Sequence, residues 1–148
     1  MERLNFPAYT FDMGLDEDGL TVIFDAIRRK YVRLTPEEWV RQHLIRYLIE
    51  HGGFPAPYAR VEIGFTYAGT PVRADLILNN RRGVPVLMAE CKAPDVRITQ
   101  TVFEQLSRYN SVINARYLVV TNGLTHFCVT PGETGYVFLN ELPTFSEG

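Results

Sequence analysis

Residues 72–92 read VRADLILNNRRGVPVLMAECK, two apolar runs on either side of the turn-forming sequence NRRG at residues 80–83. Apolar and β-branched runs bounded by Asn and Gly are typical of strands joined by a tight turn. Such a short connection makes the two strands antiparallel neighbours. The segment therefore predicts a β-hairpin with strands over residues 72–79 and 84–92.

Further elements flank this hairpin on both sides. The sequence TPEE at residues 35–38 has a capping threonine, a proline at the first helical position and a following glutamate, which together predict the start of a helix. Gly52 and Gly53 predict its end. The other predicted elements are strands over 59–67, 116–121, 125–130 and 135–139 and a helix over about 99–114. Strand 116–121 is expected to return parallel to strand 84–92. This order predicts an α/β fold with a mixed central sheet flanked by helices.

The spacing of apolar residues before residue 35 does not clearly indicate either a helix or a strand. Apolar residues in VIFDAIRRKYV (22–32) fit a helix, whereas KYVRL (30–34) resembles a strand, so both types stay open. The segment also holds the densest basic cluster of the chain: Arg28, Arg29, Lys30 and Arg33. We interpret that cluster as a solvated charged face.

Composition limits the class of protein. The chain has 148 residues, 46% hydrophobic, with 15 basic against 17 acidic residues, which argues against a wholly basic nucleic-acid coat. Two cysteines are too few for a disulfide framework and indicate a reducing compartment. No apolar run approaches the roughly 18 residues of a membrane span. We expect one soluble, cytoplasmic domain over residues 1–142, with its core over about 35–130 and a frayed tail over 143–148.

Three charged side chains stand out within the hairpin. Glu90 and Lys92 are two residues apart and therefore share one face of their strand. A symmetric turn would place Asp75 opposite Glu90, with Cβ atoms about 4.5–5.5 Å apart, although a bulge at Pro85 would shift this register by one. Opposed carboxylates repel each other unless a cation lies between them, and Mg²⁺ can bridge such a pair.

Lys92 is the candidate third member of this group. Thirteen of the fifteen basic residues are arginines, so a lysine in an apolar strand is unusual. Lysine, unlike arginine, can take part in acid–base chemistry. Metal-assisted hydrolysis of a phosphodiester needs a Lewis acid, a water molecule and a nearby positive charge. An ordinary ion-pair ladder at a strand end is the alternative, and from the residues alone both stay open.

Asp75 and Glu90-Cys91-Lys92 resemble the signature of PD-(D/E)XK nucleases, although the proline that usually precedes the aspartate is absent. Gln105 and Tyr109, one helical turn apart, resemble the QxxxY motif of RecB-like and type I restriction nucleases. Core packing is an equal interpretation of Tyr109.

The wider sequence over about residues 4–130 resembles the N-terminal nuclease domain of type I restriction enzyme R subunits, in a short stand-alone bacterial form. The segments that carry this resemblance are LNFPAYTF (4–11), IFDAIRRKYVRLTPEEWVRQH (23–43), AECKAP (89–94), FEQLSRYN (103–110) and LVVTNGLTHF (118–127).

The resemblance implies an αβββαβ core and a set of site residues. The implied catalytic residues are Asp75, Glu90, Lys92, Gln105 and Tyr109, with Mg²⁺ or Mn²⁺ held by Asp75 and Glu90. Glu38 would be a further metal ligand on the first helix, although a capping-box role explains it equally well. Glu62 is a weaker candidate ligand.

The leading hypothesis is a Mg²⁺-dependent nuclease, either an endonuclease or an exonuclease, acting on DNA in restriction or repair. Phosphate contacts would come from arginines, and the candidates are Arg73, Arg81, Arg82, Arg97 and Arg108, of which the two turn arginines fit a solubilising role equally well. The sequence pI of about 5.9 predicts weak, salt-sensitive DNA binding without a partner.

Two other hypotheses stay open. One is a DNA-binding or assembly module that has the nuclease fold but no turnover of its own. Because the chain has no Walker-type motif, a motor or restriction–modification protein would be its partner. The other, a hydrolase of small phosphoesters, is less favoured because His43, His51 and His126 lack zinc-ligand spacing. The sequence implies no membrane partner and leaves a monomer or homodimer open.

Overall fold

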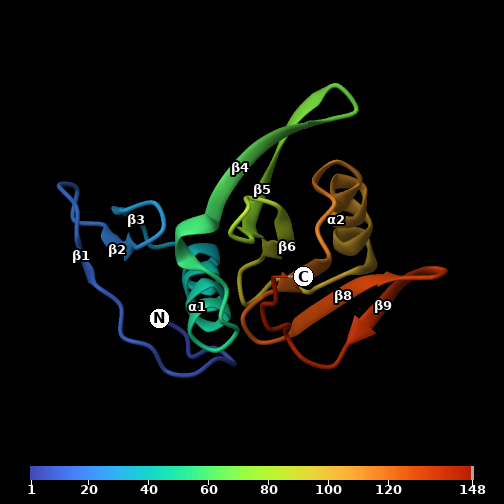
Figure 1. The fold of residues 1–148 in the computed structure, drawn as a ribbon. Helices are drawn as coiled ribbons and strands as arrows, with labels where there is room; N and C mark the ends of the chain where they lie inside the picture. The colour runs from blue at the N-terminus through green and yellow to red at the C-terminus, as the bar shows by residue number, and fades with distance from the viewer. Residues whose placement is uncertain (148) are drawn as a thin grey trace.

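A six-stranded mixed sheet forms the centre of the molecule (Figure 1). The computed structural model describes residues 1–147 and orders the strands β4-β5-β6-β7-β8-β9. Only β6 and β7 pair in parallel; the other neighbours are antiparallel. The strands are β4 Ala59–Tyr67, β5 Thr70–Asn79, β6 Pro85–Cys91, β7 Tyr117–Thr121, β8 His126–Gly132 and β9 Gly135–Leu139. The predicted mixed α/β sheet is confirmed.

Two helices cover opposite faces of this sheet. Helix α1 spans Pro36–Glu50 and helix α2 spans Gln100–Ile113, and Figure 1 shows the sheet between them. The alternation of strand side chains explains this arrangement. In β5, Leu76 and Leu78 pack in the cluster that includes α1 residues, whereas Ile77 packs in the cluster that includes α2 residues. The hairpin therefore contributes to both hydrophobic layers.

Helix α1 begins as the sequence predicts. The Thr35 hydroxyl accepts a hydrogen bond from the Glu38 backbone N–H at 3.0 Å, and Pro36 occupies the first turn. The helix ends before Gly52, where a Cβ atom would lie 2.5 Å from the Leu48 carbonyl oxygen. A short 3₁₀ helix, η1 (Ala56–Tyr58), then leads into β4.

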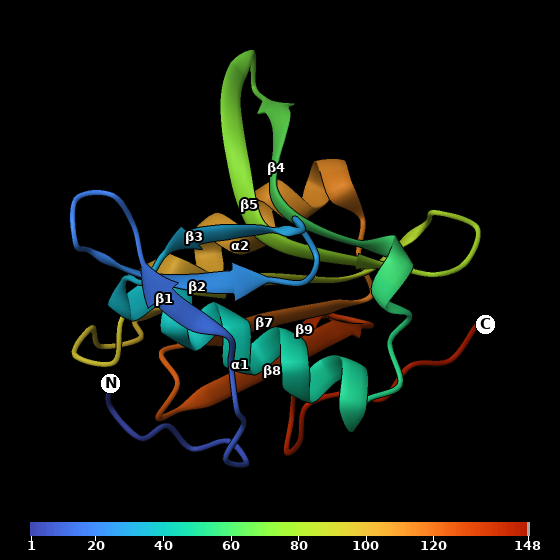
Figure 2. The ribbon, with the colours of Figure 1, turned by 90° about the vertical axis from the view of Figure 1, so that its left-hand side faces the viewer.

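The N-terminal segment forms a separate three-stranded antiparallel sheet in the order β1-β2-β3 (Figure 2). Its strands are β1 Met13–Leu15, β2 Thr21–Asp25 and β3 Lys30–Arg33. The strand alternative therefore holds for this segment. The Asp25 side chain explains why, because it accepts hydrogen bonds from the backbone N–H groups of Ile27 and Arg28 and stabilises a turn in place of a helix.

Near the chain end, Phe145 packs against the loop that follows α1. The Phe145 backbone N–H donates to the Gly52 carbonyl at 2.7 Å, and its ring lies 5.5 Å from that of Phe54. Gly148, the last residue of the tail expected to fray, lies outside the described residues. No helix within residues 1–147 is long and apolar enough to cross a membrane.

Replacing Thr35 by alanine is expected to lower the free energy of unfolding by about 1 kcal/mol, because the Glu38 N–H loses its capping acceptor. Urea denaturation measures this change. Thr99→Ala is the matched control, since Thr99 stands at the start of α2 but its hydroxyl makes no capping bond within the described chain. Equal losses in the two variants would contradict the capping role of Thr35.

Candidate functional site

The register of the β5–β6 hairpin agrees with the symmetric turn expected from the sequence. Leu76 pairs with Ala89, and continuing this register by one residue brings Asp75 opposite Glu90. The irregularity expected at Pro85 does occur, but it lies next to the turn. The pairing nearer to Asp75 is therefore not shifted.

Asp75 and Glu90 form a largely buried pair of carboxylates, each with about a quarter of its side chain exposed. Asp75 Oδ2 accepts a hydrogen bond from the Cys91 backbone N–H at 2.7 Å. Burial raises the pKa of Asp75 above its ordinary value. Burial, with the added repulsion of Asp75, raises the pKa of Glu90 to about 7. In this buried setting, both carboxyl groups are harder to ionise than in water.

Lys92 provides one of the positive charges near this pair. Its Nζ lies 3.4 Å from Glu90 Oε1, and its backbone N–H donates to the Thr121 carbonyl at 2.8 Å on neighbouring β7. Glu90 and Lys92 therefore face the same space from one strand, as the two-residue spacing predicts.

The donor chemistry of this pair fits Mg²⁺. Magnesium prefers oxygen ligands and is usually bound through one or two carboxylates, with water and substrate phosphates completing its shell. Asp75 and Glu90 supply two such carboxylates. Within residues 1–147, three or more His, Cys, Asp and Glu side chains nowhere gather into a metal cage. A bound ion would therefore depend on water or substrate for its other ligands.

Glu38 is fully engaged by neighbouring side chains. Its Oε1 accepts from Arg28 Nη2 at 2.7 Å and from Arg41 Nη2 at 2.6 Å. Its Oε2 accepts from Arg41 Nε at 2.9 Å and from Gln42 Nε2 at 3.0 Å. Burial alone would raise the pKa of Glu38, but the bonds from Arg41, Gln42 and Arg28 outweigh it and lower that pKa. A metal role for Glu38 would require these bonds to break.

Arg41 links Glu38 to the carboxylate pair. Its Nη2 lies 3.2 Å from Glu62 Oε1, and its Nη1 lies 3.9 Å from Asp75 Oδ1. Burial lowers the pKa of the Arg41 guanidinium, but the bonds to Glu38 more than compensate and raise it. Arg41 is therefore a fixed positive charge beside Asp75, although no motif in the sequence points to it.

Glu62 sits in an unusual backbone conformation within β4. Its φ is +52°, although the flanking pairs Val61–Leu76 and Ile63–Ala74 are regular. A non-glycine residue with positive φ inside a strand is strained, and such strain clusters at functional sites. In this conformation, the Glu62 carboxylate forms ion pairs with Arg41 at 3.2 Å and with Arg73 at 3.3 Å.

A cavity of about 310 Å³ opens beside Asp75, between the small sheet, the first turns of α1 and the central sheet. It is lined by Arg28, Val32, Arg33, Thr35, Glu37, Glu38, Arg41, Glu62, Asp75 and Cys91. Sequence reasoning singled out Glu38 on α1 but not Glu37. The charge of Glu37 helps to raise the pKa of both Asp75 and Glu90. Glu37 lies four residues before Arg41, and this spacing places both side chains on one face of the helix. The spacing could have identified Glu37 from the sequence.

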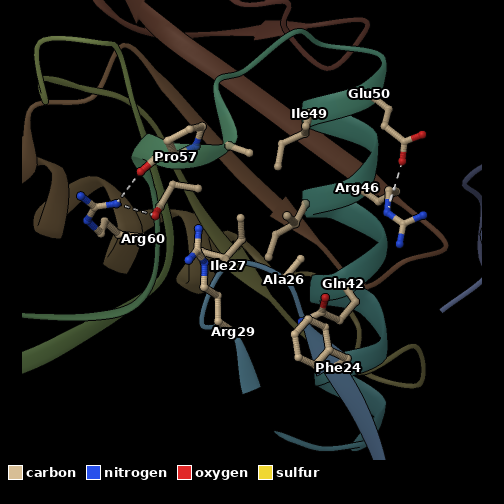
Figure 3. A pocket seen from close by; sticks show the side chains of 13 residues that line it. Phe24, Ala26, Ile27, Arg29, Gln42, Arg46, Ile49, Glu50, Pro57 and Arg60 are labelled. Carbon is tan, nitrogen blue, oxygen red and sulfur yellow. Dashed lines mark hydrogen bonds and ion pairs between the residues drawn. The ribbon is translucent and has the colours of Figure 1, made fainter. Parts of the chain in front are cut away.

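A second cavity, of about 500 Å³, lies between α1, the β2–β3 turn and the start of β4 (Figure 3). Its apolar lining includes Ile27 and Ile49. Two of its arginines are held by the chain itself: Arg46 Nε lies 3.2 Å from Glu50 Oε2, and Arg60 Nη1 donates to two backbone carbonyls. Asp75 lines the smaller cavity and not this one, so the candidate site is the smaller cavity, with Glu90 and Lys92 on the strand beside Asp75.

Gln105 and Tyr109 pair with each other on α2. Gln105 Nε2 donates to the Tyr109 hydroxyl at 3.0 Å, as expected for residues one turn apart. The Tyr109 ring packs 5.5 Å from the rings of both Phe65 and Tyr67 on β4. Within the described residues this pair forms no hydrogen bond with Asp75, Glu90 or Lys92.

The five candidate DNA-contacting arginines lie in different places. Arg73 lies beside Glu62 near the site, and Arg97 and Arg108 are exposed. Arg81 and Arg82 lie at the far turn of the hairpin, on the order of 20 Å along the strand from Asp75. Arg81 pairs there with Glu147. Of the five, within the described residues, only Arg73 forms an ion pair with a residue that lines the cavity beside Asp75, namely Glu62.

This chain is similar to a known protein family and to a solved structure. Residues 36–143 match the family model described as the type I restriction enzyme R protein N terminus. A solved fragment of a protein assigned as an HsdR subunit of a type I restriction enzyme from Vibrio vulnificus YJ016 has a similar fold, with a TM-score of 0.55 and 20% identity. The similarity covers 75% of this chain and 24% of the solved chain, so this chain corresponds to about a quarter of its length. No curated protein matches the sequence.

The raised pKa of Glu90 predicts a pH-dependent stability. Because folding favours protonated Glu90, its stabilising contribution is complete below pH 4.5 and is lost as the pH rises to about 7. Relative to Glu90→Gln, the metal-free wild type is expected to lose up to about 3 kcal/mol between pH 4.5 and 8.

Urea denaturation in a chelator at both pH values measures this difference. Glu104→Gln, on the exposed side of α2, is the control and is expected to follow the wild type at each pH. Parallel stability curves for wild type and Glu90→Gln would show that Glu90 is not perturbed.

Proposed function

This chain belongs to the family of type I restriction enzyme R protein N termini, and we propose that it is a Mg²⁺-dependent nuclease domain that hydrolyses DNA phosphodiester bonds. The observation that carries the proposal is the register that brings Asp75 opposite Glu90, with Lys92 on the same strand. The order α1, β4, β5, β6, α2, β7 supports a PD-(D/E)XK core.

In this proposal Asp75 and Glu90 hold the ion, and Mn²⁺ would fit the same oxygens. The ion supplies a Lewis acid for a phosphoryl oxygen. The ammonium of Lys92 is near enough to Glu90 to hold the attacking water or a phosphate oxygen. The water oxygen forms a bond to phosphorus and gives up a proton to solvent, the bond from phosphorus to the leaving oxygen breaks, and the leaving oxygen takes up a proton from solvent. Arg41 adds a second fixed positive charge beside Asp75, where negative charge develops.

Gln105 and Tyr109 have a supporting role in this proposal. Their hydrogen bond and the packing of Tyr109 on β4 hold the two polar groups in one orientation on α2. Such a fixed pair is suited to positioning a DNA strand rather than to breaking its bonds.

A partner is part of the proposal. The net charge of −2 gives little general attraction to DNA, and this chain spans about a quarter of the solved relative. We therefore expect a restriction–modification or motor protein to hold the DNA in place.

A DNA-binding or assembly module without turnover is the second candidate. One observation favours it: Arg41 already lies 3.9 Å from Asp75 and partly neutralises the carboxylate pair. If this charge keeps a divalent ion out, the fold would bind DNA without cutting it.

Nuclease assays separate the two candidates. Plasmid and linear DNA are incubated with Mg²⁺ or Mn²⁺ and with wild type, Asp75→Asn, Lys92→Ala and the control Asp18→Asn, which changes an exposed carboxylate in the β1–β2 turn. We expect cleavage by wild type and control, and a loss of at least about 100-fold in the other two variants. Equal cleavage by all four would remove the site assignment. DNA binding without cleavage by any of them would favour the second candidate.

A further inference from the structure

The small sheet β1–β3 adjoins the candidate site. Its three strands lie within residues 13–33, ahead of the family-matched range of 36–143. Nevertheless Arg33, the last residue of β3, lines the same cavity as Asp75. Any DNA strand that reaches Asp75 through this cavity would pass next to Arg33.

A buried ion network fixes the small sheet to the site. Asp25 is completely buried and pairs with Arg28 Nε. Arg28 Nη2 in turn reaches Glu38 Oε1 at 2.7 Å, and its Nη1 lies 3.6 Å from Glu62 Oε2. Removing one partner from such a network leaves an uncompensated buried charge, which is strongly destabilising. The sheet is therefore a firmly held part of the site.

The basic cluster of residues 28–33 contains one arginine that belongs to this ion network and three basic residues that do not. The guanidinium of Arg28 is already committed to carboxylates. Arg29, Lys30 and Arg33 are exposed, and no ion pair within residues 1–147 includes them. An exposed guanidinium without a carboxylate partner is well suited to bidentate contact with a phosphate. Only Arg33 of these three lines the cavity.

We propose that Arg33 contacts a backbone phosphate of the DNA strand that enters the Asp75–Glu90 site, and that β1–β3 is therefore a substrate-binding element. This inference rests on the proposed nuclease function. For Arg33, this proposal replaces the interpretation of the basic cluster as a solvated charged face. The contact would be independent of DNA sequence, because phosphates carry no base information.

The test measures binding of a labelled DNA duplex at several KCl concentrations, with Ca²⁺ in place of Mg²⁺ to limit cleavage. Arg33→Gln is expected to weaken binding about fivefold to tenfold at low salt. The slope of log affinity against log salt should become shallower by about 1. Arg33→Lys, which retains the charge, should restore most of that slope.

Arg116→Gln is the matched control. Arg116 is exposed, and it precedes Tyr117, which pairs with Leu87 at the end of the sheet away from Glu90. Thermal denaturation of each variant checks that the fold is intact. If the wild type binds and cuts DNA but Arg33→Gln behaves like Arg116→Gln, the inference is wrong and the proposed function stands. Low salt strengthens the attraction to phosphates that a partner would otherwise supply, so a wild type that neither binds nor cuts DNA at the lowest salt contradicts both.

Discussion

The pairing register between β5 and β6 is the constraint on which both the core and the site depend. With Leu76 opposite Ala89, alternate side chains of β5 reach the two helical layers, and Asp75 comes opposite Glu90. A slip of one residue would turn every side chain of the strand to the other face. The apolar packing of the hairpin thus forces two carboxylates together against their own repulsion.

Compensating charges surround this pair. Lys92 lies next to Glu90, and Arg41 lies next to Asp75 while Glu38 and Glu62 hold it in place. Burial and the charge of Asp75 nevertheless leave Glu90 with a raised pKa. In the proposed nuclease, a divalent ion would neutralise the pair, and in the alternative binding module Arg41 would be sufficient.

Local signals explain what the sequence could predict. The capping residues of α1, the turn of the β5–β6 hairpin and the apolar run of β7 each act over a few residues, and the structure follows them. The β2–β3 turn was ambiguous because Asp25 competes with a helical pattern through its own side-chain bonds. The contacts of Glu38 with Arg28, and of Arg41 with Glu62, join separate elements. Nothing in one sequence indicates which of several charges will meet across such distances.

The position of a bound divalent ion decides whether Asp75 and Glu90 form a metal site. Crystals of the wild-type protein grown with Mn²⁺ would reveal the ion by its anomalous scattering. We expect a peak within bonding distance of carboxylate oxygens from both Asp75 and Glu90, and its absence in Asp75→Asn crystals. A well-ordered site without any peak, or a peak bound by Glu38 and Glu62 instead, would contradict the proposed metal site.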